Sequence, residues 1–166
     1  MNYLLIGRPN VGKTSIFNIL TKSKSIVHKS KGTTRDWHKK NIYNFENTFI
    51  FDTPGIILRT KKNDNKKSLE ILNKIINDID IILLVIDYKS KFNQIDNEIL
   101  KWLRKFGKLI YLIINKFDNY QIEADIDYLN YNIKNNFFFS CTHKYGFKNF
   151  INFIEENSLK NSKISN

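Results

Sequence analysis

Apolar residues recur with two different periods along this 166-residue chain, and the two patterns alternate. Short continuous apolar runs are typical of strands buried on both faces of a parallel sheet, whereas apolar residues spaced three and four apart are typical of amphipathic helices. The expected strands are residues 1–6, 41–45, 48–51, 81–86, 108–114 and 137–139. The expected helices are residues 13–21, 66–78, 95–106, 122–129 and 146–156.

This alternation predicts an α/β fold, a doubly wound and mostly parallel sheet of about six strands. Residues 41–45 and 48–51 are separated only by a short polar turn, so they are expected to form a hairpin that supplies one antiparallel edge strand. The chain length indicates one domain, expected over residues 1–156. Residues 157–166 are expected to be a polar tail that frays.

Two long polar segments, residues 22–40 and 52–65, interrupt the pattern and are expected to be loops. In doubly wound sheets, ligands bind beyond the carboxyl ends of the strands. Polar motifs that directly follow an expected strand are therefore the first candidates for a functional site.

The first such motif reads Gly7-Arg8-Pro9-Asn10-Val11-Gly12-Lys13-Thr14 and matches G-x-x-x-x-G-K-[ST], the phosphate-binding P-loop. Its glycines let successive backbone N–H groups point at an anion, and Lys13 brings a positive charge to the β- and γ-phosphates. The Thr14 hydroxyl is a candidate Mg²⁺ ligand, and Ser15 opens a helix whose N-terminus faces the phosphates. A chance match is the alternative, and the flanking strand and helix argue against it.

The second motif, Asp52-Thr53-Pro54-Gly55, follows the strand at 48–51 and matches D-x-x-G. A carboxylate at a strand end can hold Mg²⁺, here through water, so Asp52 is a second metal candidate. The backbone N–H of Gly55 is expected to reach the γ-phosphate and to release the loop after hydrolysis. Taken alone, the motif could also be an ordinary Asp/Pro/Gly turn.

The third motif, Asn115-Lys116-Phe117-Asp118, follows the strand at 108–114 and matches N-K-x-D. Guanine presents N1–H and an exocyclic amine side by side, and the Asp118 carboxylate can accept both hydrogen bonds. Adenine has an acceptor at N1, so the same carboxylate would face a lone pair. Asn115 is expected to bond the base and the neighbouring loop, while the Lys116 stem packs on the ring. The motif therefore favours GTP and GDP as ligands.

Two further segments complete the expected nucleotide site. Gly32-Thr33-Thr34-Arg35-Asp36 lies in the first long loop, where a threonine hydroxyl can join the Mg²⁺ shell only with the γ-phosphate present. We choose Thr34 over Thr33 for this role. Ser140-Cys141-Thr142 follows the last strand, where backbone N–H groups of Ser140 and Cys141 are expected to meet the guanine carbonyl.

The chain carries 27 Lys and Arg against 16 Asp and Glu, a net charge of +11. Two explanations stay open: a surface for a polyanion such as RNA, or compositional bias in a chain with few arginines. Apolar runs are too short to span a membrane, the N-terminus lacks a secretory pattern, and the one cysteine, Cys141, has no internal disulfide partner. We therefore expect a cytoplasmic protein with no membrane or DNA partner.

Together these motifs resemble the Der (EngA) family of bacterial tandem GTPases, and the likeness is to the first G domain of that family. It rests on the segments GRPNVGKT, SIFNIL, GTTRD, DTPGI, IDNEILKWLRKFGK, NKFD and SCTHKYGF. GTTRD is also similar to the tRNA-modification GTPase MnmE, and DTPGI to Era. The resemblance implies a three-layer P-loop G domain, slow GTP hydrolysis with Mg²⁺, and work in large ribosomal subunit assembly with the subunit or its rRNA as partner.

The chain also departs from the family. We find neither the second G domain nor the KH-like domain, and Cys141 stands where the last motif usually has alanine. Ile56 stands where Ras-like GTPases place a glutamine that orients the attacking water. The resemblance implies that Asn10 helps to hold a K⁺ ion that supplies charge instead, and Arg35 is the rival source of that charge. Lys13, Thr34 and Asn10 are therefore the candidate catalytic residues.

Two functions remain open at this point. One is a GTP-hydrolysing molecular switch. The other is a GDP/GTP-binding module with negligible turnover, a truncated relic or a fragment of a tandem GTPase, which Ile56 and the missing partner domains favour. A P-loop kinase would leave both D-x-x-G and N-K-x-D as coincidences.

Overall fold

The computed structural model describes residues 1–23, 37–56, 58, 69–70, 72–119, 133 and 135–164, with side chains described as far as Asn157. The strands are β1 (Asn2–Ile6), β2 (His38–Asn41), β3 (Phe49–Asp52), β4 (Ile81–Asp87), β5 (Leu109–Asn115) and β6 (Asn136–Phe138). The helices are α1 (Lys13–Thr21), α3 (Gln94–Leu103) and α4 (Phe147–Ile164), with 3₁₀ turns η1 (Ile76–Asp78) and η2 (Arg104–Phe106). Within these ranges, no helix has the length and apolar character needed to cross a membrane.

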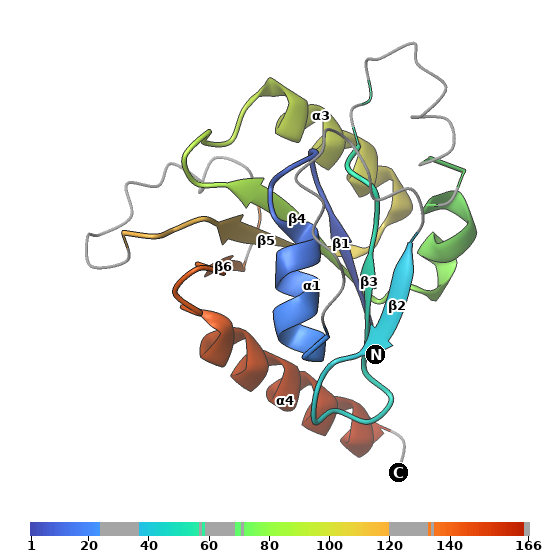
Figure 1. Ribbon diagram of the computed structural model, residues 1–166. Coiled ribbons are helices and arrows are strands. Elements are labelled where there is room, and N and C mark those ends of the chain that lie inside the picture. The colour runs from blue at the N-terminus through green and yellow to red at the C-terminus, as the bar shows by residue number, and fades with distance from the viewer. Residues whose placement is uncertain are drawn as a thin grey trace.

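The six strands form one sheet in the order β2-β3-β1-β4-β5-β6. β1 pairs in parallel with β3 and β4, and the parallel pairing continues through β5 to β6. β2 runs antiparallel to β3. Figure 1 shows helices on both faces of this sheet. The predicted α/β fold, a mostly parallel sheet with one antiparallel edge strand, is therefore confirmed.

Alternate residues of each central strand are buried on opposite faces of the sheet. In β1, Leu4 and Ile6 belong to the core that includes α3. Tyr3 and Leu5 belong to the core on the other face, which is covered by α1 and α4. The helices contribute apolar side chains at helical spacing: Ile16, Phe17, Leu20, Ile99, Leu103, Phe147, Phe150 and Ile154. The continuous apolar runs of β4 and β5 thus reflect strands that are covered on both sides.

The antiparallel hairpin lies where the sequence predicts it, but its first strand comes earlier in the chain. β2 is His38–Asn41 rather than residues 41–45, and all four of its side chains are exposed. The alternation over 41–45 belongs to the turn, where Ile42 and Phe45 pack against the core beneath α1 and α4. Asn44 takes a left-handed φ of 66° in this turn. Because an exposed edge strand has no apolar face to bury, its sequence gives no strand signal.

Lys39 of β2, and Trp37 just before β2, contact aromatic rings of β3 at this edge of the sheet. The Nζ atom of Lys39 lies 4.2 Å from the ring centroid of Phe49 and 5.2 Å from that of Phe51. The Trp37 ring, just before β2, stacks on Phe51 with 5.7 Å between centroids. All of β2 except Asn41 falls within the segment expected to be a loop, residues 22–40, of which residues 24–36 lie outside the described part of the chain.

The helix expected over residues 95–106 is present; it begins one residue earlier and ends at Gly107 as expected. α3 begins at Gln94, where the Asn93 side chain accepts hydrogen bonds from the backbone N–H groups of Ile95 and Asp96. The last turn is the 3₁₀ segment η2, and it ends at Gly107 with a left-handed φ of 64°. A side-chain cap at one end and a glycine at the other thus define this helix.

Within the helix expected over 66–78, all described residues are helical: 69–70 and 72–75 lead into the 3₁₀ turn η1. The helix expected over 122–129 lies outside the described residues. α4 continues past residue 156 to Ile164, so it includes most of the expected tail. The division into a domain over 1–156 and a fraying tail over 157–166 stays a prediction.

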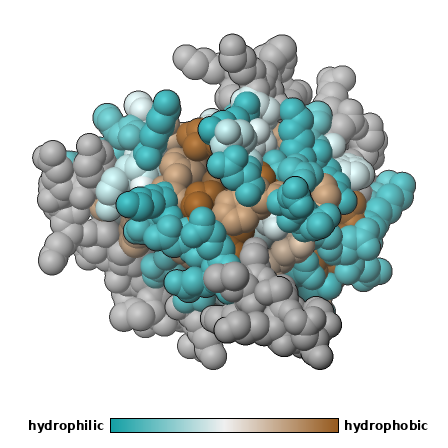
Figure 2. All heavy atoms as spheres, turned by 90° about the horizontal axis from the view of Figure 1, so that it is seen from below, coloured by the Kyte–Doolittle hydropathy of each residue, from teal (hydrophilic) through white to brown (hydrophobic). Residues whose placement is uncertain are grey.

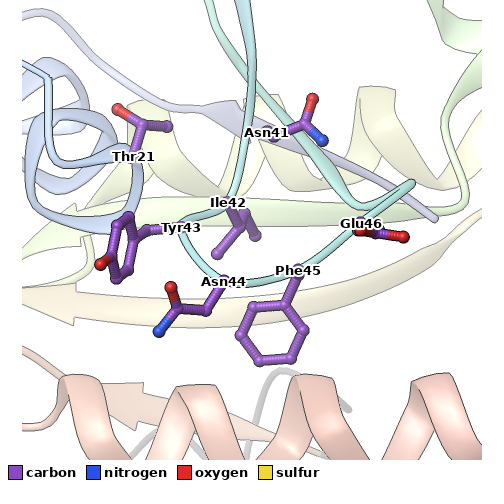
Figure 3. A pocket seen from close by; sticks show the side chains of 7 residues that line it. All are labelled: Thr21, Asn41, Ile42, Tyr43, Asn44, Phe45 and Glu46. Atoms are coloured by element: carbon purple, nitrogen blue, oxygen red, sulfur yellow. The ribbon is translucent and has the colours of Figure 1, made fainter.

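A shallow pocket lies where α1 ends and the β2–β3 turn begins, at the end of the sheet away from the carboxyl ends of the parallel strands. In Figure 3 the Phe45 ring points from this turn toward α4. Figure 2 views the same end of the molecule and shows apolar atoms near its centre, surrounded by hydrophilic side chains. The lining residues come from none of the predicted motifs: Thr21, Asn41, Ile42, Tyr43, Asn44, Phe45 and Glu46.

Candidate functional site

The described motifs meet at the carboxyl edge of the sheet. The P-loop connects β1 to α1, Asp52 ends β3, Asn115 ends β5, and Ser140 follows β6 after one residue. The segment Gly32–Asp36, which contains Thr34, lies outside the described residues. The topology therefore brings together the motifs that the sequence places after separate strands.

Two glycines allow the loops at this edge to approach one another closely. Gly12 has a φ of 94°, and a Cβ atom there would lie 2.2 Å from Nδ2 of Asn115. A Cβ atom at Gly55 would lie 2.5 Å from the Cα atom of Pro9. A side chain at either position would have to displace its neighbour, because real Cβ contacts are essentially never so short. The P-loop thus packs directly against the loops that follow β3 and β5.

The Lys13 side chain is buried and curls back into the P-loop. Its Nζ atom donates hydrogen bonds to the carbonyl oxygens of Gly7, at 3.2 Å, and Arg8, at 2.8 Å. Burial lowers the pKa of Lys13 from 10.5 to about 8, while the nearby Asp52 carboxylate acts in the opposite direction. Lys13 therefore places an already desolvated cation inside a loop shaped for anions.

Asp52 and Thr14 form the part of the site that suits a divalent cation. Thr14 Oγ1 donates a 2.7 Å hydrogen bond to Asp52 Oδ2. Asp52 is fully buried, and its Oδ1 atom has no hydrogen-bond partner in the described structure. Burial raises the pKa of this carboxyl, and the Thr14 hydrogen bond and the charge of Lys13 partly offset the effect. Hydroxyl and carboxylate oxygens are the ligands that Mg²⁺ prefers, so these two residues fit it.

The remaining P-loop residues take different environments. Val11 is buried, and the exposed Asn10 adopts a left-handed φ of 65°. Ser15, the residue after the motif, is half-buried in the first turn of α1. The Arg8 side chain turns toward α3, where its Nε atom lies 2.8 Å from Asp96 Oδ1. Within the P-loop, Arg8 thus contributes its backbone, while its guanidinium contacts a neighbouring element.

Ile56 belongs to the hydrophobic core and is 1% exposed. Its backbone N–H donates a 3.0 Å hydrogen bond to the carbonyl oxygen of Gly7. The residue that follows D-x-x-G therefore fixes the loop to the end of β1 through its backbone and packs its side chain inward.

Asn115 joins the base motif to the P-loop. Its Nδ2 atom donates a 2.9 Å hydrogen bond to the carbonyl oxygen of Val11, and the residue is 1% exposed. The thiol of Cys141 lies 3.4 Å from Asn115 Oδ1, with the sulfur as donor. Burial raises the pKa of this thiol from 9.0 to about 12, so it is protonated at neutral pH. The cysteine in the last motif thus acts as a neutral neighbour of Asn115.

Asp118 is held by two donors. Ser140 Oγ donates to Oδ1 at 2.8 Å, and Lys89 Nζ donates to Oδ2 at 2.8 Å. These hydrogen bonds, that of Lys89 first, lower the pKa of the Asp118 carboxyl, which therefore stays ionised as an acceptor. Lys116 has a left-handed φ of 62°, and its Nζ atom donates to Asp87 Oδ2 at 2.6 Å. The Asp118 carboxylate is thus ionised and held by two donors at the carboxyl edge of the sheet.

Sequence reasoning missed one part of the site, which runs from the end of β4 to the first turn of α3. Its side chains Asp96, Lys89 and Asp87 form ion pairs with Arg8 of the P-loop and with Asp118 and Lys116 of the base motif. One signal could have found it, because Asp96 lies on the buried face of α3 together with Ile99, Leu100 and Leu103. An acidic residue on an apolar helix face needs a partner.

Comparison with known proteins agrees with this geometry. Residues 2–116 match the model of a family described as 50S ribosome-binding GTPase. The chain belongs to this GTPase family. A member named GTPase Der, from a Nitratiruptor species, is 35% identical over 165 residues, which is 96% of this chain and 35% of that protein. The resemblance to Der is therefore confirmed, and the chain spans about a third of the length of the curated relatives it matches.

Solved structures share the fold of this GTPase-family chain. Era, in complex with MgGDPNP and nucleotides 1506–1542 of 16S ribosomal RNA, matches with a TM-score of 0.73 at 26% identity, over 92% of this chain and 55% of that one. NFeoB from S. thermophilus, bound to GDP.AlF4- and K+, matches with a TM-score of 0.75 at 22% identity, over 92% and 60% of the two chains. The fold of the chain is therefore that of a G domain.

Proposed function

We propose that this chain binds GTP and GDP at the carboxyl edge of its sheet and hydrolyses GTP as a slow molecular switch. One observation carries the proposal: Asn115 Nδ2 lies 2.9 Å from the Val11 carbonyl oxygen. This contact joins a base-recognition motif to a phosphate-binding loop at one edge of the sheet. A guanine nucleotide is the ligand that uses both parts together.

At the phosphate end, backbone N–H groups of Gly7–Thr14 and the ammonium group of Lys13 bind the phosphate oxygens. The Lys13 ammonium exchanges the carbonyl oxygens of Gly7 and Arg8 for phosphate oxygens. Thr14 and Asp52 would hold Mg²⁺, and Thr34 would be a third ligand. The bound ion would supply positive charge at the phosphates. The Gly55 backbone contacts the γ-phosphate, so the loop after β3 responds to its loss.

At the base end, the Asp118 carboxylate accepts hydrogen bonds from guanine N1–H and the exocyclic amine. Asn115 binds the base and the P-loop, and the Lys116 stem packs on the ring. Of the two N–H groups expected at the guanine carbonyl, that of Ser140 already donates to the Tyr145 carbonyl oxygen at 3.2 Å, so we assign this contact to the N–H of Cys141. The ionised state of Asp118 supports this assignment, because only a carboxylate accepts both bonds.

The attacking water needs a charge or a polar group that Ile56 does not supply, because its side chain lies in the core. We propose that Asn10, exposed at the tip of the P-loop, helps to hold K⁺ beside the phosphates. The NFeoB structure bound to GDP.AlF4- and K+ supports this role, since it shares the fold. Lys13, Asn10 and Thr34 are then the residues that act on the reacting phosphates.

The test is phosphate release with Mg²⁺ and GTP, measured over many turnovers in KCl and in NaCl, beside direct titration with GDP. We expect GDP binding in both salts and faster hydrolysis in KCl. Equal rates in the two salts would exclude the K⁺ role of Asn10. An absence of binding to any guanine nucleotide would exclude the proposed function itself.

A second candidate is a GDP/GTP-binding module with negligible turnover. The buried Ile56 favours it, because the position after D-x-x-G offers no side chain to the attacking water. Tight GDP binding without phosphate release, in KCl and in the presence of ribosomal subunits, would establish this alternative.

We also propose a cytoplasmic role in assembly of the large ribosomal subunit, with the subunit or its rRNA as partner. The family description, the relatives named GTPase Der and the complex of Era with 16S ribosomal RNA support it. The net charge of +11 supports contact with a polyanion. Co-sedimentation with ribosomal subunits over a series of KCl concentrations tests this role. Binding that does not change with salt would indicate that the net positive charge reflects compositional bias and not contact with RNA.

A further inference from the structure

Residues 87–96, which run from the last residue of β4 through the connecting loop to the first turn of α3, are here called the bridging segment, and they contact both parts of the proposed nucleotide site. On the P-loop side, the guanidinium of Arg8 is the point of contact. Arg8 Nε donates to Asp96 Oδ1 at 2.8 Å, and Nη2 donates to Ser90 Oγ at 2.9 Å and to the Lys91 carbonyl oxygen at 3.4 Å. One side chain from the P-loop is thus held by three groups of the bridging segment.

On the base-motif side, two ion pairs hold the loop after β5: the bridging segment supplies the acid in one pair and the base in the other. Asp87 of the bridging segment accepts from Lys116 at 2.6 Å, and Lys89 donates to Asp118 at 2.8 Å. The register of the sheet supports this arrangement, because Asp87 pairs with Asn115 across β4 and β5. The bridging segment carries an acid and then a base, and the base motif carries a base and then an acid. Opposite charges therefore face each other in only one alignment of the two loops.

Burial decides which of these contacts matters most. The Asp96 side chain is 0% exposed and that of Arg8 15%, whereas Lys89 is 66% exposed and its partner Asp118 30%. Exposed ion pairs contribute little, whereas a buried pair leaves an uncompensated charge when one partner is removed. Asp96 is itself fixed, since its Oδ2 atom accepts from the backbone N–H of Asn93 in the capping box of α3.

We propose that the bridging segment holds the P-loop and the base motif in a fixed relation before the nucleotide binds, with Arg8 and Asp96 as positioning residues. The inference rests on the proposed function, because it assigns these two loops to one ligand. Arg8 acts through its backbone, whose carbonyl oxygen accepts a hydrogen bond from Lys13. A loop already ordered in the free protein loses less conformational entropy on binding, so breaking the buried pair weakens binding at a distance.

The test compares the wild-type protein with the variants Arg8→Met and Arg8→Met/Asp96→Leu. The single variant leaves the Asp96 carboxylate buried without its cation, and the double variant replaces the pair with apolar side chains, a change that folds often tolerate. Lys101→Gln, on the exposed side of α3, is the control for losing one positive charge. Three quantities are measured: the thermal midpoint, hydrogen exchange of peptides over residues 7–15 without nucleotide, and the rate of GDP release.

We expect Arg8→Met to lower the midpoint, to speed exchange over residues 7–15 and to speed GDP release by about tenfold to about a hundredfold. The double variant should recover the part of the midpoint lost to the unpaired charge, but not the part lost with the Asn93–Asp96 capping hydrogen bond, and it should keep the fast exchange and the fast GDP release. Lys101→Gln should match the wild type in all three. This combination separates a positioning role from a role in stability alone. In the double variant the thermal midpoint then returns toward the wild-type value, while hydrogen exchange and GDP release stay fast.

Recovery of both the midpoint and the wild-type GDP release in the double variant would show that Arg8 and Asp96 only stabilise the fold. Unchanged hydrogen exchange over residues 7–15 in both variants would overturn the proposal as well. A wild-type protein that binds no guanine nucleotide would contradict the proposed function. In that case the exchange measurement still decides whether the bridging segment orders the P-loop.

Discussion

Gly12 lies so close to Asn115 that no side-chain atom fits between them: a Cβ atom on Gly12 would lie 2.2 Å from Nδ2 of the asparagine. Gly12 also has a φ of 94°, which residues with a Cβ rarely adopt. At this point the backbone of the P-loop therefore lies directly against the Asn115 side-chain amide. Their contact depends on the absence of one methyl group.

Gly12→Ala should weaken GDP binding at least about tenfold, because the methyl group displaces Asn115 and strains the backbone by about 1–3 kcal/mol. Gly107→Ala is the matched control, since Gly107 also has a positive φ, 64°, but a Cβ there meets nothing within 4 Å. It should cost about 1 kcal/mol of stability and leave GDP binding unchanged. Isothermal titration with GDP and urea denaturation measure the two effects, and equal loss of GDP binding in both variants would contradict the argument.

Asp118→Asn should change the preferred base from guanine to xanthine. An amide keeps one acceptor and gains a donor, which matches the N1–H and the carbonyl oxygen that xanthine presents in place of the guanine amine. GDP affinity should fall by about a hundredfold or more, while XDP affinity rises. Competition of GDP and XDP for a fluorescent nucleotide measures the change. If Asp118→Asn still prefers GDP over XDP as the wild type does, Asp118 does not contact the base.

Asp52→Asn should stabilise the nucleotide-free protein and abolish Mg²⁺-dependent hydrolysis. The wild type buries a carboxylate oxygen without a hydrogen-bond partner in the described structure, and the amide removes the charge at that position. The gain in the free energy of unfolding should be about 1 kcal/mol or more. Urea denaturation at pH 7 and phosphate release are the measurements, and a less stable variant would contradict this account of the carboxylate.

The same residue predicts a pH dependence. Burial raises the pKa of Asp52 above its ordinary 3.8, so the folded protein favours the protonated acid more than the unfolded chain does. This stabilising contribution is fully present below pH 3.8 and is lost as pH rises through the raised pKa. The free energy of unfolding of Asp52→Asn should therefore fall less over this interval than that of the wild type. Urea denaturation at a series of pH values compares the two proteins.

Cys141 should react slowly with thiol reagents in the folded protein. Because burial raises its pKa from 9.0 to about 12, the thiolate fraction at pH 8 is about a thousandfold smaller than in the unfolded chain. A colorimetric disulfide reagent should therefore label the chain rapidly in urea and slowly without it. Bound GDP should slow the native reaction further, since Cys141 lies beside Asn115. A native rate within about tenfold of the unfolded rate would contradict the assigned burial.

The sequence was sufficient to predict the strands that are buried on both faces of the sheet. β4 and β5 are continuous apolar runs because α1, α3 and α4 cover them, and the motifs followed from their places at strand ends. β2 was misplaced because its four side chains are exposed, while the apolar residues that suggested a strand, Ile42 and Phe45, belong to the turn.

Within the site, local patterns were sufficient for the P-loop and the base motif. The pair of Arg8 and Asp96 was not predicted, because 88 residues separate them and neither lies in a pattern that refers to the other. Only the sheet order, which places β4 beside β1, brings the start of α3 to the P-loop. Side-chain pairs of this kind follow from the fold and not from any short segment.

The polar edge strand β2 has a consequence for how copies of this chain meet one another. A second molecule that tried to extend the sheet at this edge would bring its own Lys39 and Lys40 against the same two lysines. Lysines on an open edge oppose such pairing through repulsion between like charges. The exposed lysines that left β2 without a strand signal in the sequence are therefore also the residues that disfavour sheet extension at this edge.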